Sequence, residues 1–359
     1  MTREEGDGLI LSHMREEGAG AHKGQDKGTV LLSCQGRTKE PSLCLAPFLY
    51  APAPSSRICE KIRPSPSSLV SAGKKILAEA GVENAGRDAE SLMCFVTGLD
   101  RQALFMSRDD EADDACRERF FSLIERRASG EPLQYITGEQ WFMGYRFSVD
   151  PSVLIVRPET EILAEKAIGY LRSVRGQNGE GPANVLDLCT GTGAIATVIA
   201  LECPGAKITA SDISGEALAT AENNARAHGV EGRISFVRSD LFEGLGPGPG
   251  FAGFDLIVTN PPYIRSDEIQ SLQREIVEHE PVIALDGGAD GLSFYRRIAT
   301  EAAAFLKNDA CVFAEIGHDQ AEEAANIFKN AGFSGVSVFQ DLAGIDRVIT
   351  ACRPPAICV

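Results

Sequence analysis

Four residues that follow a predicted strand at 254–259 could hold a planar amide or amine: Asn260-Pro261-Pro262-Tyr263. The lone pair of a conjugated NH2 group is delocalised, so its nitrogen is a poor nucleophile. Two acceptors on its N–H bonds, the Asn260 side-chain oxygen and the Pro261 carbonyl, would hold the group and help restore lone-pair density. The prolines fix the backbone, and Tyr263 offers a face for stacking. A rigid turn alone would explain the prolines but not Asn260 and Tyr263.

Methyl transfer from a sulfonium donor is the chemistry that this arrangement suits best. Attack on the sulfonium neutralises its charge, and the product nitrogen loses its proton afterwards, so positioning matters more than a strong base. The sequence shows no Ser/His/Asp pattern and no metal-ligand pattern near these residues, and its five histidines are scattered. We therefore expect no metal and no catalytic histidine.

A second group of residues lies between a predicted strand at 185–188 and a predicted helix at 194–201. It reads Asp187-Leu188-Cys189-Thr190-Gly191-Thr192-Gly193-Ala194, and its glycines allow backbone N–H groups to approach a ligand. Asp212 ends the next predicted strand, where a carboxylate can accept hydrogen bonds from both ribose hydroxyls of a nucleoside. NAD-dependent and S-adenosylmethionine-dependent enzymes share these features, and a tight turn with a surface aspartate would look the same.

The elements that position these residues alternate between short β-rich runs and amphipathic runs. Strands are predicted at 185–188, 208–213, 234–237, 254–259, 312–316, 336–339 and 347–351. Strict alternation with helices predicts a doubly wound, mostly parallel α/β sheet of seven strands, with ligands at the carboxyl ends of the strands. The last two strands are close in sequence, which favours an antiparallel hairpin at one edge.

The N-terminal part of the chain is organised differently. Residues 1–64 have no helical or strand period and are predicted to be a poorly ordered extension. Helical spacing predicts a small helical domain at 65–132, and aromatic residues around Gly144 predict a β-hairpin linker at 133–156, packed between two domains. The predicted catalytic domain at 157–353 and a tail at 354–359 complete the chain.

Composition limits the classes of partner. The chain has 359 residues with a formal net charge of −16, and the acidic excess lies after residue 64, which argues against nucleic-acid binding. Its ten cysteines show neither Cys-x-x-Cys pairs nor zinc-ligand spacing. We interpret them as free thiols and expect a cytoplasmic location. No apolar run reaches the length of a membrane span.

These motifs, taken in order, resemble the HemK/PrmC family of protein-glutamine N5-methyltransferases. The resemblance runs from about residue 67 to 352, roughly four-fifths of the chain. The two motifs above belong to it. It also includes Gly130-Glu131-Pro132-Leu133-Gln134-Tyr135-Ile136-Thr137-Gly138, Arg157-Pro158-Glu159-Thr160-Glu161, His279-Glu280-Pro281 with Ala284-Leu285, Gly288 to Leu292, Glu315-Ile316-Gly317 with Gln320, and Asp346-Arg347-Val348.

The resemblance implies a Rossmann-like methyltransferase domain that transfers a methyl group from S-adenosylmethionine to the glutamine of the Gly-Gly-Gln loop in peptide chain release factors. It implies that the helical domain recognises the release factor. Asn260, Pro261, Pro262 and Tyr263 would bind the glutamine, with Asn260, Pro261 and Tyr263 catalytic. The cofactor would be held by Cys189, Thr190, Gly191, Thr192, Gly193, Asp212, Asp240, Leu241 and Asn260, with Asp240 and Leu241 beside the adenine.

Three positions depart from the family's usual pattern. Cys189 stands where glycine is usual, Val156 stands where proline is usual, and Leu241 is aromatic in some relatives. Cysteine is small, so position 189 is expected to tolerate it if the backbone angle φ is negative there. A required positive φ would be unfavourable for cofactor binding.

Four other functions are compatible with parts of the sequence. A glutamine of a ribosomal protein could be the substrate, because the shared motifs barely separate the two targets. An adenine-N6 methyltransferase could use the same tetrapeptide, but it would need phosphate contacts that the acidic charge disfavours. A catalytically silent adaptor fits poorly with Gly191, Gly193, Asp212 and Asn260 all in place, and an NAD dehydrogenase leaves the tetrapeptide unexplained.

Overall fold

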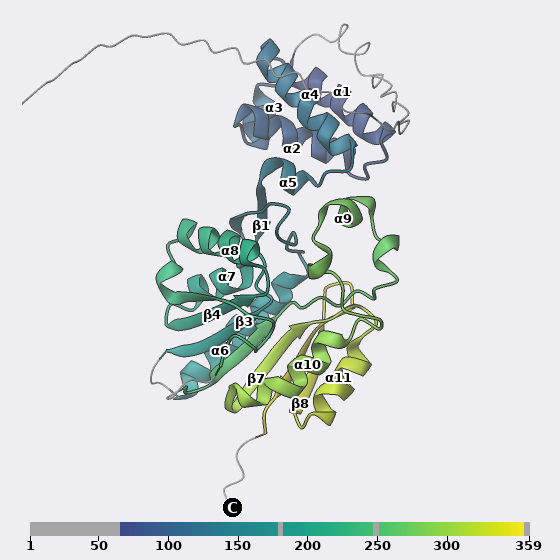
Figure 1. Ribbon diagram of the computed structural model, residues 1–359. Coiled ribbons are helices and arrows are strands. Elements are labelled where there is room, and N and C mark those ends of the chain that lie inside the picture. Colours follow the sequence, from purple (N-terminus) through teal and green to yellow (C-terminus); the bar gives the residue numbers. More distant parts are fainter. Residues whose placement is uncertain (1–64, 179–181, 247–250, 355–359) are drawn as a thin grey trace, which may run out of the picture. The chain divides into compact units, whose positions relative to one another are not determined.

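The computed structural model describes residues 65–178, 182–246 and 251–354 (Figure 1). The predicted extension at 1–64 lies outside the described residues, and of the predicted tail only residue 354 lies within them. Across the described ranges, none of the helices combines the length and the apolar character needed to cross a membrane.

A bundle of helices forms the first described part of the chain. It comprises α1 (Pro66–Glu79), α2 (Ala85–Thr97), α3 (Arg101–Met106), α4 (Asp114–Ala128) and α5 (Leu133–Thr137). Ser65 starts α1 with a capping box to Ser68, and Pro66 follows at the first helical position. Leu69, Leu92, Phe120 and other apolar side chains at helical spacing form its buried core. The pattern predicted α1, α2 and α4, but not the two shortest helices.

Arg127 of α4 is buried in a network of ionic contacts. Its Nε donates to Asp88 Oδ2 of α2 at 2.8 Å, and its Nη1 donates to Glu275 Oε2 at 2.5 Å. Glu275 belongs to α9 (Arg274–His279), so this side chain connects the helical bundle to a segment that follows the tetrapeptide.

Replacing Arg127 by methionine should therefore destabilise the protein by about 3–5 kcal/mol, because Asp88 would remain buried without its cation. Arg126→Met is the matched control, since the side chain of Arg126 is 44% exposed in its ion pair with Glu131. Its loss should change the free energy of unfolding by less than about 1 kcal/mol. Chemical denaturation measures both, and equal effects of the two variants would contradict the buried-pair interpretation.

The predicted hairpin is present as β1 (Glu139–Phe142) and β2 (Tyr145–Ser148), paired antiparallel. Met143 and Gly144 form its two-residue turn with φ of 53° and 79°. Positive φ at both turn residues is required for the turn to match the right-handed twist of the two strands. Phe142 and Phe147 are buried, as the predicted packing of the aromatic cluster requires. Trp141 is one of the aromatic residues around Gly144 that were predicted to pack between two domains, and for Trp141 this prediction is wrong because its side chain is 62% exposed. Side chains alternate across a strand, and Trp141 faces away from Phe142.

The rest of the chain builds a seven-stranded sheet in the order β5-β4-β3-β6-β7-β9-β8. The strands are β3 (Ala183–Leu188), β4 (Ala206–Asp212), β5 (Ile234–Arg238), β6 (Phe254–Thr259), β7 (Leu306–Glu315), β8 (Ser334–Gln340) and β9 (Asp346–Cys352). The first five are parallel, and β9 pairs antiparallel with both β7 and β8. The predicted doubly wound sheet and its antiparallel edge hairpin are confirmed. The strand order reverses between β3 and β6, where ligands bind in such sheets.

Helices cover both faces of this sheet. Val185 of β3 packs in one core cluster with α6 (Thr160–Asn178) and α7 (Ala194–Glu202), and the adjacent Leu186 packs in another with α10 (Ser293–Glu301) and α11 (Ala321–Asn330). A strand buried on both faces explains the continuous apolar run. The described residues also form α8 (Gly215–Ala227) and the 3-10 turns η3 (Glu231–Arg233), η4 (Ile269–Ser271), η5 (Val282–Ala284) and η6 (Ala302–Ala304).

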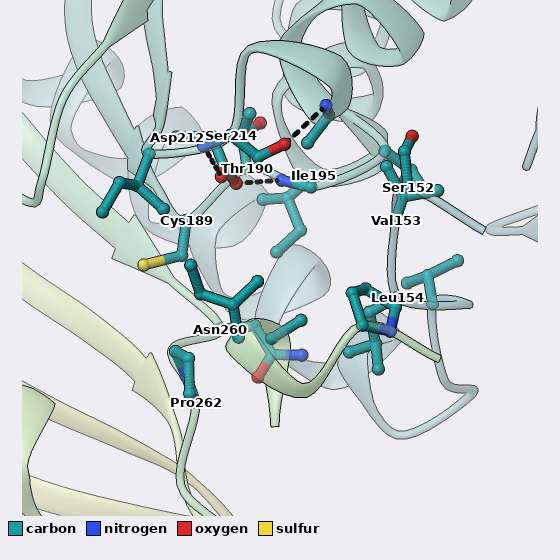
Figure 2. A pocket seen from close by; sticks show the side chains of 18 of the residues that line it. Ser152, Val153, Leu154, Cys189, Thr190, Ile195, Asp212, Ser214, Asn260 and Pro262 are labelled. Atoms are coloured by element: carbon teal, nitrogen blue, oxygen red, sulfur yellow. Dashed lines mark hydrogen bonds between the residues drawn. The ribbon is translucent and has the colours of Figure 1, made fainter. Parts of the chain in front are cut away.

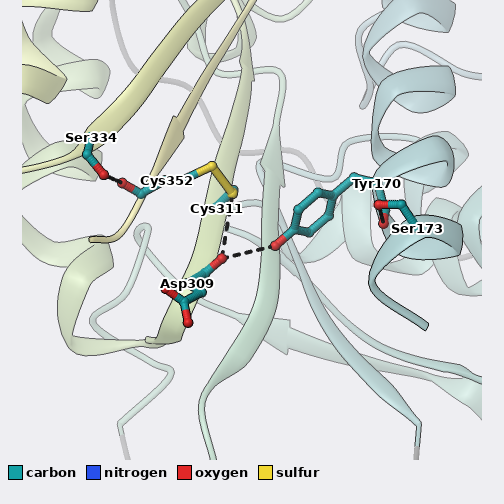
Figure 3. Close-up of a disulfide and its surroundings, with 6 residues drawn as sticks. All are labelled: Tyr170, Ser173, Asp309, Cys311, Ser334 and Cys352. Atoms are coloured by element: carbon teal, nitrogen blue, oxygen red, sulfur yellow. Dashed lines mark hydrogen bonds between the residues drawn. A yellow bond between two sulfur atoms is a disulfide. The ribbon is translucent and has the colours of Figure 1, made fainter. Parts of the chain in front are cut away.

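A disulfide joins Cys311 of β7 to Cys352 of β9, so the interpretation of all ten cysteines as free thiols is wrong (Figure 3). The antiparallel register sets these residues directly opposite each other, with 4.0 Å between their Cα atoms. The sequence gives no local spacing for this pair because the two cysteines belong to distant strands. Cys94, Cys116 and Cys189 remain thiols.

Candidate active site

A cavity of about 210 Å³ lies at the carboxyl ends of β3, β4, β5 and β6 (Figure 2). Figure 2 shows Asp212 and Ser214 in the upper part of the view and Asn260 and Pro262 in the lower part. Two motifs that are distant in sequence therefore line one cavity. The predicted site residues that line it are Cys189, Thr190, Gly191, Thr192, Asp212, Asp240, Leu241, Asn260 and Pro262.

The loop between β3 and α7 is shaped by its backbone. Gly193 is the N-terminal cap of α7 with φ of 72°, and a Cβ there would lie 2.8 Å from Cβ of Ala221 in α8. Glycine is thus required at 193 by both conformation and space. A Cβ on Gly191 would meet no atom within 4 Å, which leaves that part of the loop open to a ligand.

Cys189 adopts a φ of 57°, which does not satisfy the condition under which cysteine was expected to be tolerated. The left-handed conformation costs a residue with a Cβ about 1–2 kcal/mol. Cys189 is half-buried at the wall of the cavity, and desolvation raises the pKa of its thiol above the usual range.

We expect Cys189→Gly to raise the free energy of unfolding by up to about 1 kcal/mol, with cofactor affinity unchanged within a few-fold, because strain is relieved without loss of a ligand contact. Leu241, with φ of 48°, is the matched comparison, but its side chain is buried in the core. Leu241→Gly should therefore lose at least about 2 kcal/mol. Denaturant titration with calorimetry checks both, and a destabilised Cys189→Gly would show that the loop is not strained.

Asp212 joins the glycine loop to the start of α8. Its Oδ2 accepts from the Gly191 N–H and its Oδ1 accepts from the Ser214 N–H, both at 2.9 Å. A carboxylate oxygen has two lone pairs, so Asp212 retains acceptor capacity, and the residue lines the cavity. Burial raises the pKa of Asp212, and these backbone hydrogen bonds act against that rise. The residue can thus hold the loop and accept two hydroxyl protons at once.

Asp187 lies beneath the same loop and is fully buried. Its Oδ2 accepts from Thr190 Oγ1 at 2.6 Å and from the Ala196 N–H at 3.2 Å. Burial raises the pKa of Asp187 to about 7. Its role in the structure is to tie the glycine loop to the first turn of α7.

Asp240 and Leu241 form the wall of the cavity after β5. Arg297 of α10 donates from Nη1 to Asp240 Oδ1 at 2.8 Å, and Arg297 also lines the cavity. Sequence reasoning missed Arg297 because α10 is remote in sequence and no motif marks the residue. The Leu241 carbonyl accepts from Ser239 Oγ at 2.6 Å, which fixes the turn on which both wall residues lie.

The Asn260 side chain is oriented by one hydrogen bond. Its Nδ2 donates to Thr160 Oγ1 at 3.2 Å, and none of the described residues donates to its Oδ1. Pro261 and Tyr263 do not line the cavity. The Tyr263 hydroxyl donates to Glu315 Oε1 at 3.0 Å, and the Tyr263 carbonyl accepts from Gln320 Nε2 at 2.9 Å. A stacking role of the Tyr263 ring therefore stays a prediction.

Two further segments of the resemblance meet at this site. Arg157 donates from Nη2 to Glu280 Oε1 at 2.6 Å, and the Ile155 N–H donates to Glu280 Oε2 at 3.3 Å. These bonds hold the segment around Val156 against the segment that contains Pro281 and Ile283, and both segments line the cavity. Val156 is buried, and its carbonyl accepts from Gln140 Nε2 at 2.9 Å, so the segment keeps its place without the usual proline.

The described residues contain no group of three or more His, Cys, Asp or Glu side chains placed to hold a metal ion. The cavity is lined instead by the glycine loop, by the carboxylate of Asp212 and by Asn260, whose side-chain oxygen can accept a hydrogen bond. Such a set fits a nucleoside at one end and a planar nitrogen at the other. Asp212 and Gly191 fit the nucleoside, because they present unused acceptor capacity and open space.

The chain is similar to known families and proteins. It matches the PrmC N-terminal domain over residues 68–138 and the methyltransferase small domain over residues 177–302. It is 42% identical over 277 residues to a release factor glutamine methyltransferase of Geobacter sulfurreducens, which covers 76% of this chain and 91% of the relative. For the protein of that description from Agrobacterium fabrum, the identity is 39% over 282 residues, with 79% and 95% covered. A solved protein-(glutamine-N5) methyltransferase (release factor-specific) from Alicyclobacillus acidocaldarius is 35% identical and covers 58% of this chain and 100% of its own, with a TM-score of 0.34.

Proposed function

Because this chain belongs to the release factor glutamine methyltransferase family, we propose that it methylates the side-chain nitrogen of the glutamine in the Gly-Gly-Gln loop of a peptide chain release factor. It is an S-adenosylmethionine-dependent protein-glutamine methyltransferase. The observation that carries the proposal is the placement of Asn260 beside the glycine loop, in one cavity. The modification would tune translation termination, in the cytoplasm where release factors act.

We assign one end of the cavity to the cofactor. Backbone groups of residues 189–193 and the free lone pairs of Asp212 would hold it, with Asp240 and Leu241 beside the adenine and Asn260 next to the reacting methyl group. S-adenosylmethionine, when bound, supplies an electrophilic methyl group on a sulfonium. The protein contributes binding and orientation.

The other end is assigned to the glutamine. The Asn260 Oδ1 and the Pro261 carbonyl would accept the two N–H bonds of the substrate amide and hold its nitrogen toward the methyl group. Pro262 lines the cavity and would limit the position of the amide plane. The nitrogen carries an extra proton only after transfer, and it loses that proton readily, so no general base is assigned. The helical bundle is assigned to recognition of the release factor.

A methyl-transfer assay with labelled S-adenosylmethionine tests the choice of substrate. Unmethylated release factor, ribosomal proteins, DNA and RNA are offered in parallel, and we expect label on the release factor. Label on a ribosomal protein would keep the chemistry and change the target. Label on nucleic acid alone would reject the proposal and the charge argument behind it.

A further inference from the structure

The segment Arg157 to Glu161 brings Thr160 to the Asn260 side chain. Thr160 is the first residue of α6, 1% exposed, and its Oγ1 accepts from Asn260 Nδ2 at 3.2 Å. A hydroxyl has one proton to donate and two lone pairs with which to accept. If the Thr160 hydroxyl donates its proton to another group, its lone pairs face Asn260 and the Asn260 NH2 group must point toward it. If it donates to Asn260, the Asn260 Oδ1 must point toward it.

Glu315 is a buried carboxyl group that interacts with the Thr160 hydroxyl. The parallel register of β6 and β7 sets Thr259 opposite Ala314, so Asn260 and Glu315 both lie at the carboxyl ends of these adjacent strands. Glu315 is 2% exposed, and its Oε1 accepts from the Tyr263 hydroxyl at 3.0 Å. Its Oε2 is buried with no donor in hydrogen-bonding geometry among the described residues. The Thr160 hydroxyl is beside this carboxyl and, with Tyr263, acts against the rise in the pKa of Glu315 that burial causes.

A buried carboxylate oxygen without a donor is costly, so the Thr160 proton is drawn toward Glu315. The lone pairs of Thr160 Oγ1 then face Asn260, and only an NH2 group can approach them. The Asn260 Oδ1 is left on the opposite side, free to accept a proton from a bound amide. With the reverse polarity, the Asn260 NH2 group would face the substrate NH2 group and repel it.

We propose that Glu315, acting through Thr160, fixes the direction of the Asn260 side-chain amide so that Oδ1 faces the substrate nitrogen. Both are positioning residues, and Glu315 also holds the Tyr263 hydroxyl, so it connects the two side chains that flank the prolines. This inference rests on the proposed glutamine methylation. It assigns a function to the Arg157–Glu161 segment beyond its contact with Glu280.

Thr160→Val removes the hydroxyl at nearly constant volume and is the primary test. We expect kcat on the release factor to fall roughly ten- to hundredfold, because the amide loses its fixed direction, while the Kd for S-adenosylmethionine changes less than about twofold. Thr160→Ser keeps the hydroxyl and should restore most of the rate. Thr197→Val is the matched control: Thr197 is 0% exposed in α7, its Oγ1 has no partner among the described residues, and it does not line the cavity.

Glu315→Gln tests the proposed direction of the hydrogen bonds along Glu315, Thr160 and Asn260. A glutamine can still accept from Tyr263 through Oε1, but its NH2 group would donate toward Thr160 and remove the acceptor for the hydroxyl proton. We expect a loss of kcat similar to that of Thr160→Val. An unchanged kcat in either variant would overturn the proposal that Glu315 orients Asn260 through Thr160.

A readout that does not depend on activity separates this inference from the proposed function. Hydrogen exchange of the Asn260 side-chain NH2 protons, followed by NMR, should be slower in wild type and Thr160→Ser than in Thr160→Val. Equal exchange rates of these protons in wild type, Thr160→Ser and Thr160→Val would overturn the proposed orienting role of Thr160, even if glutamine is methylated. If the wild type fails to methylate glutamine, the proposed function is rejected, and the exchange rates still decide whether Thr160 orients Asn260.

Discussion

Asn260→Ala should lower the rate of methyl transfer by about a hundredfold or more, while the affinity for S-adenosylmethionine stays within a few-fold. The Asn260 Oδ1 is the acceptor on one N–H bond of the substrate amide, and alanine leaves only the Pro261 carbonyl. The cofactor loses one minor neighbour, whereas its assigned anchors at Gly191 and Asp212 are untouched. Single-turnover kinetics and calorimetry measure the two effects separately.

Asn223→Ala is the control for Asn260→Ala. Asn223 is exposed on α8, accepts from Arg226 of the same helix and does not line the cavity, so its loss should leave both quantities unchanged. Turnover of Asn260→Ala near the wild-type rate would show that the amide clamp is wrong. A large loss of cofactor affinity would instead show that Asn260 acts mainly on the cofactor.

Asp212→Ala should weaken S-adenosylmethionine binding by about 1.5–3 kcal/mol, as expected for the loss of a charged hydrogen-bond acceptor. The structure adds a second reason, because both carboxylate oxygens also hold backbone N–H groups of the loop and of α8. Calorimetric titration measures the change. Asp290→Ala is the matched control, since Asp290 also accepts from a backbone N–H, at Leu292, but does not line the cavity.

The pH dependence of the same affinity provides a further check on Asp212. Only the ionised carboxylate can accept from both hydroxyls, and burial raises the pKa of Asp212 above its usual range. Cofactor affinity should therefore fall as the pH is lowered, beginning at a higher pH than an exposed aspartate would give. Unchanged affinity in Asp212→Ala would place the ribose elsewhere.

The sequence predicted the helices and strands whose apolar residues are strongly periodic or whose ends are marked by glycine or proline. Alternating apolar strands and helices identified the sheet, and glycines and prolines marked the two strand ends where the site lies. The cavity could be anticipated because parallel strands bring Gly191, Asp212 and Asn260 to one edge. Those inferences rest on local patterns, which a single sequence displays directly.

The contacts that sequence reasoning missed all join residues distant in the chain. Thr160 meets Asn260, Arg297 meets Asp240, and Cys311 pairs with Cys352 only once the strand order is known. The sequence left the sign of φ at Cys189 open, because residue size does not reveal backbone conformation; the structure gives a positive φ. The aromatic residues around Gly144 were predicted to pack between two domains, but the alternation of the hairpin strand places Trp141 on the exposed face.

The most direct test of the central claim is to locate the methyl group by tandem mass spectrometry after reaction with unmethylated release factor. The account predicts one methyl group on the side-chain nitrogen of the Gly-Gly-Gln glutamine. It should be absent when that glutamine is replaced by asparagine in the substrate, and strongly reduced at equal reaction time when Asn260→Ala replaces the wild-type enzyme. A methyl group on any other atom, or the same yield from the substituted release factor, would contradict it.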